Sequence, residues 1–435
     1  MSLPPVEIPL GAMRFNSDSQ KLEYFNGQVW MQVHTFSPNL DGGARGLFMG
    51  NFTEVSPGST GTIDYVTISS QGNATDFGDL LTVEYYGAGC SSRTRGIYMG
   101  GEEPMTDTIS YVTISTTGNS ADFGNLTESV KYLPSGGSND TRGIRAGGVD
   151  GPTSNPFNTI DYVTIASTGD AKDFGDLTYT DNNVCSSAAS RTRAIWWGGG
   201  TEPNLENNNI NYVTIATTGN AADFGDITVA RRGSATVSNT TRAVCCGGRT
   251  PTIQVTMDYV TIASTGNAVD FGDITIRAAS CTSTMPAASP TRGVIAGGTG
   301  PASQSDISYI TIATTGNDQQ FGDLSTTSNS VGGCSNSTRA VFRIREAANV
   351  ESIQLATLGN GTDFASGIAG IYGSMLSSPT RGVIGTYTQS PATDTGLNTM
   401  EYVSFQTGGD FVDFGDLSVE RWSAPTSSNT NGGTL

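Results

Sequence analysis

The most informative part of the chain reads Asp161-Tyr162-Val163-Thr164-Ile165-Ala166-Ser167-Thr168-Gly169-Asp170-Ala171-Lys172-Asp173-Phe174-Gly175-Asp176-Leu177. This segment recurs with small changes along almost the whole chain. Its Tyr-Val-Thr-Ile part alternates apolar and polar residues, which is typical of a half-buried strand. The Gly with Asn or Asp that follows is typical of a turn, because these residues tolerate positive φ. The chain is therefore predicted to be one β-structural unit repeated.

Upstream of this segment each copy has a hydrophobic strand that starts at an arginine, preceded by Thr or, in the first copy, by Ala, and that usually ends in glycine. The arginines mark eight copies, 42 to 51 residues apart: Arg45, Arg95, Arg142, Arg193, Arg242, Arg292, Arg339 and Arg381. This period exceeds that of most helical repeats, roughly 33 to 47 residues. Four short strands fit in each copy, and four-stranded sheets repeated radially form a propeller. We therefore predict an all-β, eight-bladed β-propeller.

The order of elements within a copy resembles a kelch repeat: a strand, Gly-Gly, a loop, a Tyr-led strand and an aromatic residue in the fourth strand. Phe stands where a kelch repeat usually has its closing Trp, and the resemblance covers roughly residues 40 to 430. The seventh copy departs from it, with Phe342-Arg343-Ile344-Arg345 in place of the glycine pair and Phe364-Ala365-Ser366-Gly367 in place of Phe-Gly-Asp. That copy is either a specialised face or a drifted one, and we favour drift.

The two ends of the repeated region complement each other. The first copy begins at its second strand, Arg45-Gly46-Leu47-Phe48-Met49-Gly50, whereas the last continues into Glu420-Arg421-Trp422-Ser423-Ala424-Pro425. We predict that this C-terminal strand completes the first blade, because closure of the ring hides sheet edges that would otherwise pair with other chains.

Residues 1–39 lie outside the repeats, and we assign residues 40–435 to the propeller. The amino-terminal piece reads as three short strands of a β-meander. Its Gly-Ala-Met-Arg-Phe-Asn, Lys-Leu-Glu-Tyr and Asn-Gly-x-Val-Trp elements resemble a short module found in tail-fibre and other appendage proteins of tailed bacteriophages. Because so small a sheet is marginal alone in water, it must pack on its own propeller, a symmetry mate or another virion protein. We predict an anchoring role for Phe15, Tyr24, Phe25 and Trp30.

The composition argues against several classes of partner and site. A net charge of −18 with only 22 basic residues gives no footprint for nucleic acid or an anionic membrane surface. We find no secretory leader and no run of about 20 apolar residues, so we expect synthesis in the host cytoplasm, no membrane insertion and localisation in the virion. The six cysteines lack metal-binding spacing and His34 is the only histidine, so no metal or other cofactor is expected.

The repeated carboxylates do not indicate catalysis. Catalytic acid–base pairs are singular, whereas Asp-Phe-Gly-Asp recurs from copy to copy. Neither a Gly-x-Ser-x-Gly motif nor a phosphate-binding loop is present, so we predict no catalytic residue and a non-enzymatic protein. We instead predict Arg–Asp contacts that fix the register of neighbouring blades, since a guanidinium favours a planar carboxylate partner. The residues concerned are Arg95, Arg142, Arg193, Arg242, Arg292, Asp173, Asp176, Asp223, Asp226, Asp270 and Asp273.

Two features are candidates for recognition. Trp196 and Trp197 are adjacent on one strand, so their rings are predicted on opposite faces of the sheet, where a flat ring can stack on a sugar. The variable loops that follow each Gly-Gly are expected at one face of the propeller, and function concentrates in loops on a rigid scaffold.

These observations lead to one functional expectation. The chain is expected to be a structural protein of a tailed-phage virion, in a tail fibre, tail or head appendage, that acts in assembly or host-surface attachment. The expected partners are other virion proteins, further copies of the chain and a host surface glycan or protein. The alternative is a bacterial kelch-like module that binds a protein or glycan, and a sugar-processing enzyme is third.

Overall fold

The computed structural model divides the chain into two compact units, Met1–Gly43 and Ala44–Leu435. The sequence-based boundary lay between residues 39 and 40. The structure describes residues 9, 11–16, 21–32, 45–52, 59–83, 88–92, 94–101, 105–130, 137–139, 141–150, 155–180, 186–190, 192–199, 206–274, 287–289, 291–297, 304–328, 331–335, 338–344, 349–366, 374–378, 380–385, 397–405, 412–421 and 426–428. Within these ranges the regular elements are all strands, so the fold is all-β as predicted.

The first unit is a three-stranded antiparallel sheet in the order β1 (Met13–Asn16), β2 (Lys21–Phe25) and β3 (Trp30–Gln32). A tight turn joins the last two strands. Its Asn26 Oδ1 accepts hydrogen bonds from the backbone N–H groups of Gln28 (3.0 Å) and Val29 (2.8 Å), and Gly27 has φ of 96°. The described residues thus form the predicted meander.

The second unit contains eight four-stranded antiparallel sheets among its described residues. The first comprises β37 (Thr426–Ser428), β4 (Arg45–Phe52), β5 (Ser59–Thr67) and β6 (Thr75–Asp79). The second comprises β7 (Ala88–Ser91), β8 (Arg95–Gly101), β9 (Thr106–Thr113) and β10 (Ala121–Asn125). The third comprises β11 (Gly137–Ser138), β12 (Arg142–Ala146), β13 (Thr159–Thr164) and β14 (Lys172–Asp176). The fourth comprises β15 (Ser186–Ala189), β16 (Arg193–Trp197), β17 (Asn207–Thr214) and β18 (Ala222–Arg231).

The other four sheets repeat this order. The fifth comprises β19 (Ala235–Ser238), β20 (Arg242–Cys246), β23 (Thr256–Thr261) and β24 (Val269–Asp273), with a hairpin of β21 (Arg249–Thr250) and β22 (Thr252–Ile253) inserted. The sixth comprises β25 (Ala287–Ala288), β26 (Arg292–Ala296), β27 (Gln304–Thr311) and β28 (Gln319–Ser328). The seventh comprises β29 (Val331–Ser335), β30 (Arg339–Ile344), β31 (Asn349–Gln354) and β32 (Thr362–Ser366). The eighth comprises β33 (Ser374–Ser377), β34 (Arg381–Gly385), β35 (Leu397–Ser404) and β36 (Val412–Arg421).

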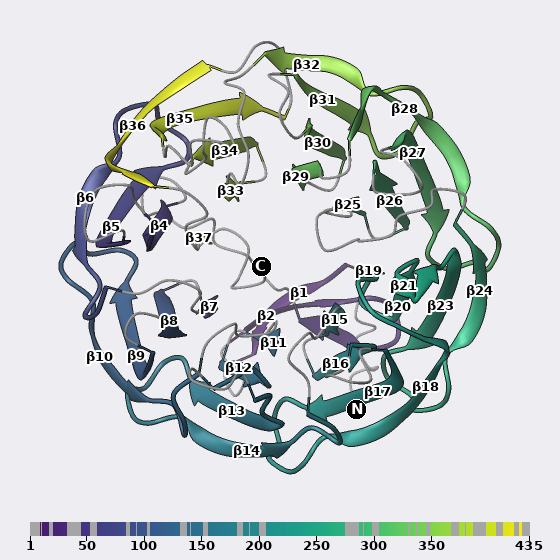
Figure 1. The fold of residues 1–435 in the computed structure, drawn as a ribbon, viewed down its shortest axis with the longest axis horizontal. Coiled ribbons are helices and arrows are strands. Elements are labelled where there is room, and N and C mark those ends of the chain that lie inside the picture. Colours follow the sequence, from purple (N-terminus) through teal and green to yellow (C-terminus); the bar gives the residue numbers. More distant parts are fainter. Residues whose placement is uncertain are drawn as a thin grey trace, which may run out of the picture. The chain divides into compact units, whose positions relative to one another are not determined.

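The sheets of the second unit follow one another in sequence order (Figure 1). Fourth strands such as β10, β14 and β24 lie on the outside, and first strands such as β7 and β33 lie on the inner side. The repeated phenylalanine of the fourth strand is buried, with at most 4% exposure in the sheets where it is described, and its ring meets the ring of the repeated tyrosine edge-on at 5.5–5.9 Å. Edge-on aromatic pairs add about 0.5–1.5 kcal/mol beyond area burial.

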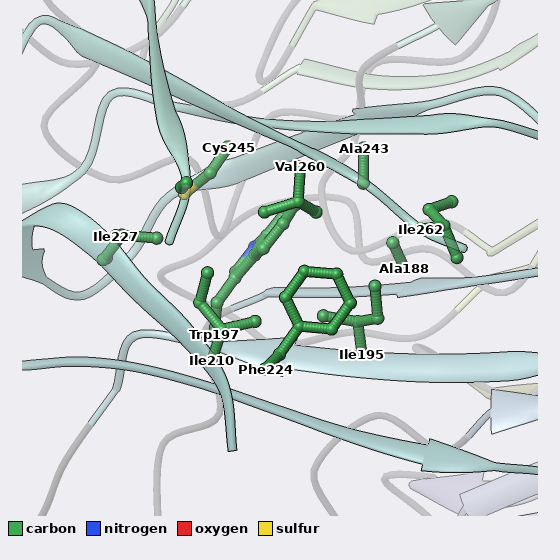
Figure 2. Close-up of a cluster of buried hydrophobic side chains, with 11 residues drawn as sticks. Ala188, Ile195, Trp197, Ile210, Phe224, Ile227, Ala243, Cys245, Val260 and Ile262 are labelled. Carbon is green, nitrogen blue, oxygen red and sulfur yellow. The ribbon is translucent and has the colours of Figure 1, made fainter. Parts of the chain in front are cut away.

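The hydrophobic core lies between consecutive sheets. Figure 2 shows one cluster in which Trp197, Ile210 and Phe224 of the fourth sheet pack against Val260 and other apolar residues of the fifth. A corresponding cluster is shared by the eighth and first sheets, where Phe414 and Met400 join Phe48 and Ile68. Clusters of this kind among the described residues cover both faces of the first six sheets, which explains why their second strands are almost continuously apolar.

The C-terminal strand of the first sheet differs in position from the predicted one. β37 pairs with β4, with Thr426 opposite Phe48 and Ser428 opposite Gly46. The predicted segment, residues 420–425, was wrong: Glu420 and Arg421 belong to β36, and residues 422–425 lie outside the described residues. The reason is that β36 continues five residues past Asp416, pairing Leu397 with Arg421.

Candidate functional site

In seven of the eight sheets, the described residues show the repeated arginine joining its sheet to the next. Its guanidinium carbon lies 4.4–4.7 Å from the centre of the repeated tyrosine ring in its own sheet, a cation–π geometry. Its Nη1 donates a hydrogen bond of 2.7–3.3 Å to a backbone carbonyl of the following sheet. The donor–acceptor pairs are Arg45–Ile114, Arg95–Ile165, Arg142–Ile215, Arg193–Ile262, Arg242–Ile312, Arg292–Leu355 and Arg381–Ile68.

The Asp-Phe-Gly-Asp motif is used locally and between sheets. In five sheets, Oδ1 of the first aspartate accepts a hydrogen bond of 2.9–3.0 Å from the N–H of the glycine two residues later. Asp223, for example, accepts from Gly225. The backbone N–H of its second aspartate donates to the Asn of the turn in the next sheet, as Asp176 does to Asn220 (3.3 Å), Asp226 to Asn267 (3.2 Å) and Asp273 to Asn317 (3.0 Å). Asp173 and Asp270 are the first aspartates of the motif in the third and fifth sheets. They lie opposite Asp161 and Asp258 on the neighbouring third strands.

The prediction that the repeated arginines pair with the aspartates of this motif is therefore wrong. Among the described residues, Arg95, Arg142, Arg193, Arg242 and Arg292 form no ion pair with the aspartates of this motif. The arginines do link neighbouring sheets, but a carbonyl oxygen accepts the bond. The physical reason is that the motif lies on the fourth strand. There its first carboxylate accepts the N–H of the glycine in the local β-bulge, and the carboxylates are otherwise open to solvent.

Glycine makes the junction between fourth strands close. The turn glycine donates its N–H to the repeated phenylalanine carbonyl of the preceding sheet, as Gly266 does to Phe224 (2.7 Å). A Cβ atom on Gly225 would lie 2.5 Å from the carbonyl carbon of Gly266, and Gly225 has φ of 140°. Both space and backbone conformation therefore require glycine here.

A second set of polar contacts was missed by the sequence analysis. The residue before the repeated tyrosine, or before Ser352 in the seventh sheet, is polar and at most 4% exposed in seven sheets: Asp64, Ser110, Asp161, Asn211, Asp258, Ser308 and Glu351. Several of these residues accept a hydrogen bond from the preceding sheet, as Asp161 and Asp258 do from Thr127 and Thr228 (2.6 Å each). The available signal was the polar residue that precedes each Tyr in an otherwise apolar strand.

Three buried arginines pair with these acids. Arg231 Nη2 lies 2.6 Å from Asp258 Oδ2, and Arg421 and Arg145 pair in the same way with Asp64 and Asp161. Arg231 and Arg421 end β18 and β36, so these two pairs connect the fourth sheet to the fifth and the eighth to the first.

The two inter-sheet pairs differ in their electrostatic balance. Burial lowers the pKa of the Arg421 guanidinium, although the Asp64 carboxylate opposes this effect. Burial also acts to lower the pKa of Arg231, but there the Cys245 sulfur and Asp258 outweigh it, and the pKa is raised. In both pairs, burial of the guanidinium and the charge of the paired carboxylate act in opposite directions on its pKa.

The predicted recognition role of Trp196 and Trp197 is wrong. Both side chains are 1% exposed, and each joins a hydrophobic cluster on its own side of the fourth sheet. The strand alternation was predicted correctly, but in stacked sheets both faces are covered. Neither indole ring therefore offers a surface to a sugar.

The candidate anchoring residues divide between the two faces of the small sheet. Tyr24 is 40% exposed and shares its face with Met13 (62%) and Met31 (42%), its register partners. Phe25 and Trp30 are half-buried, with ring centres 5.5 Å apart and ring planes inclined at 50°, and the Arg14 guanidinium carbon lies 4.2 Å from the Trp30 ring centre. The backbone of Phe15 lies in β1, and its side chain is outside the described part of the structure.

The described ranges contain neither a metal-binding cluster nor a membrane-spanning helix. No group of three or more His, Cys, Asp or Glu side chains there could hold a metal ion. No helix in the same ranges is long and apolar enough to cross a membrane. The Gly-Gly loops predicted as a contact surface lie largely outside the described residues, including 102–104, 151–154 and 201–205.

Comparisons with known proteins inform the fold alone. No protein-family model matches the sequence, and no curated protein matches it either. Among solved structures, the chain is similar to the crystal structure of the computationally designed Ika8 protein, with a TM-score of 0.50 and 15% sequence identity. The similarity covers 79% of this chain and 91% of that one. At this identity it supports an arrangement of strands and carries no information on activity.

Proposed function

We propose that the eight sheets are the blades of a closed, kelch-like β-propeller. The support is that the same contacts recur from sheet to sheet and also connect the eighth sheet to the first. Arg381 Nη1 donates to the Ile68 carbonyl (3.3 Å), and Gly72 N–H donates to the Phe414 carbonyl (2.8 Å). The pairing of β37 with β4 adds a strand from the end of the chain to the first sheet. A succession of contacts that returns to its start is what a ring requires.

We propose further that the protein is a non-enzymatic structural component of a tailed-phage particle, acting in assembly or host attachment. The observation that carries this proposal is the exposed apolar face of the amino-terminal sheet. Met13, Tyr24 and Met31 are direct cross-strand neighbours on that face, and a three-stranded sheet of this size is marginal without a partner. The repeated polar residues of the larger unit are occupied between sheets, which fits a scaffold rather than a catalyst.

Immunoelectron microscopy tests the proposal. Antibodies raised against the segment from Lys21 to Gln32 would be applied to particles from a lysate of the host that carries this chain. The proposal expects label at a fixed, symmetric position on the particles, reduced when peptide of the same sequence competes. Particles without label, in a lysate that contains the chain in free form, would favour the alternative of a bacterial kelch-like binding module.

A further inference from the structure

Two arginines lie opposite each other beside the hairpin of the fifth sheet. Arg232 follows β18 and pairs with Arg249 of β21: Arg232 N–H donates to the Arg249 carbonyl (3.0 Å), and Arg249 N–H donates to the Arg232 carbonyl (2.9 Å). Residues paired in this way project their side chains from the same face, with Cβ atoms about 5 Å apart. Like charges placed directly opposite are destabilising. The arrangement therefore calls for negative charge between the two side chains.

The described residues supply that charge only in part. Glu206 Oε1 lies 3.8 Å from Arg232 Nε, whereas Arg249 is exposed and forms no ion pair within the described ranges. The adjacent Arg231 is fully buried and its Nη2 pairs with Asp258, so its charge is already balanced within the core. Among the described residues, one carboxylate, that of Glu206, thus lies beside the two opposed arginines, in a chain whose net charge is −18.

We propose that Arg232 and Arg249 bind an oxyanion, the carboxylate or phosphate group of a ligand. A guanidinium offers a planar fork of donors that matches both groups, and two forks from neighbouring strands hold an anion from two sides. The hairpin β21–β22, which positions Arg249, is an insertion between β20 and β23 of the fifth sheet.

The test titrates the full-length protein separately with inorganic phosphate and with glucuronate, against sodium chloride of equal ionic strength. Binding is followed by NMR through the arginine Nε–Hε signals and by the thermal unfolding midpoint. We expect a saturable response to at least one anion, and the responding anion identifies the ligand class. Arg249→Gln and Arg232→Gln should each weaken binding about tenfold, since charge-assisted hydrogen bonds are lost.

Lys172→Gln is the matched control, because it removes one exposed positive charge from the third sheet and should leave anion affinity unchanged. In chloride alone, Arg249→Gln should unfold at the same or a higher temperature than the native chain, since it relieves like-charge repulsion. Responses to both anions that equal those to chloride would overturn the proposal. So would affinity unaffected by both arginine variants, or a lower unfolding temperature of Arg249→Gln in chloride.

Discussion

At the scale of single residues, the junctions between sheets differ most at the buried position before the repeated tyrosine. Asp258 is paired with an arginine from the preceding sheet, whereas Ser308 at the equivalent position has no charge and its Oγ has no hydrogen-bond partner. The same fold thus accommodates ionic and neutral junctions. A buried ion pair adds little net stability but becomes costly when one member is removed. We therefore interpret the inter-sheet ion pairs as contacts that favour the correct pairing of adjacent sheets and contribute little net stability.

Removing one member of the Arg231–Asp258 pair tests this interpretation. Asp258→Leu leaves a buried guanidinium without its carboxylate and should lower the free energy of unfolding by about 3–5 kcal/mol. The double variant Arg231→Met/Asp258→Leu should recover most of that loss. Ser308→Ala, the control, should change the free energy by less than about 1 kcal/mol. Urea denaturation monitored by tryptophan fluorescence measures all three, and an equal loss in the single and double variants would contradict the interpretation.

Burial also sets the chemistry of Cys90. Desolvation raises the pKa of its thiol to about 12, so the thiol stays protonated in the folded protein. Its contribution to stability should be fully present below about pH 9 and be lost as the pH rises toward 12, because the unfolded chain ionises first. Alkylation at pH 9 followed by peptide mass spectrometry should find Cys90 unmodified until urea is added. Rapid modification of Cys90 in the folded protein would show that the thiol is accessible.

At the scale of elements, the fourth strands and the turns of the next sheet approach each other through their backbones. Gly225 and Gly266 have similar positive φ angles, 140° and 151°, but only Gly225 faces neighbouring backbone. A Cβ on Gly266 would meet nothing within 4 Å. The two positions therefore separate backbone strain from steric contact.

Alanine at each of these glycines should reveal the difference. Gly266→Ala carries only the conformational cost, about 1–3 kcal/mol. Gly225→Ala carries a similar cost and also pushes the turn of the fifth sheet away, which adds about 1–3 kcal/mol. Unfolding free energies of the two variants give the comparison, and equal values would argue against a close junction.

The C-terminal strand β37 is the edge strand of the first sheet and pairs with β4. Ending the chain after Arg421 removes β37 and leaves β4 without its neighbour on that side. Exposed edge strands pair with other chains, so the truncated protein should associate and unfold at a lower temperature. Sedimentation velocity and a thermal scan test this, with the substitution Ser427→Ala, which keeps the strand, as control. A truncated chain that sediments and melts like the full-length protein would show that β37 is dispensable.

At the scale of the whole molecule, much of the architecture could be predicted because the repeats expose it. Tyr162-Val163-Thr164-Ile165 and its equivalents mark a strand by alternation alone, and the glycines mark the turns. The partner of Arg142 could not be predicted, because a backbone carbonyl leaves no signature in the sequence. The burial of Trp196 and Trp197 depends on sheets covering both faces, which alternation within one strand does not reveal. The Arg421–Asp64 pair joins residues from opposite ends of the chain, so spacing gives no hint of it.

Closure of the eight sheets into one ring is tested most directly by cryo-electron microscopy of the purified full-length chain. Views along the central axis should show eight spokes of equal length, with no wider gap between the sheet that contains Arg381 and the sheet that contains Ile68. An open arc, a helical array or a number of spokes other than eight would contradict a closed propeller.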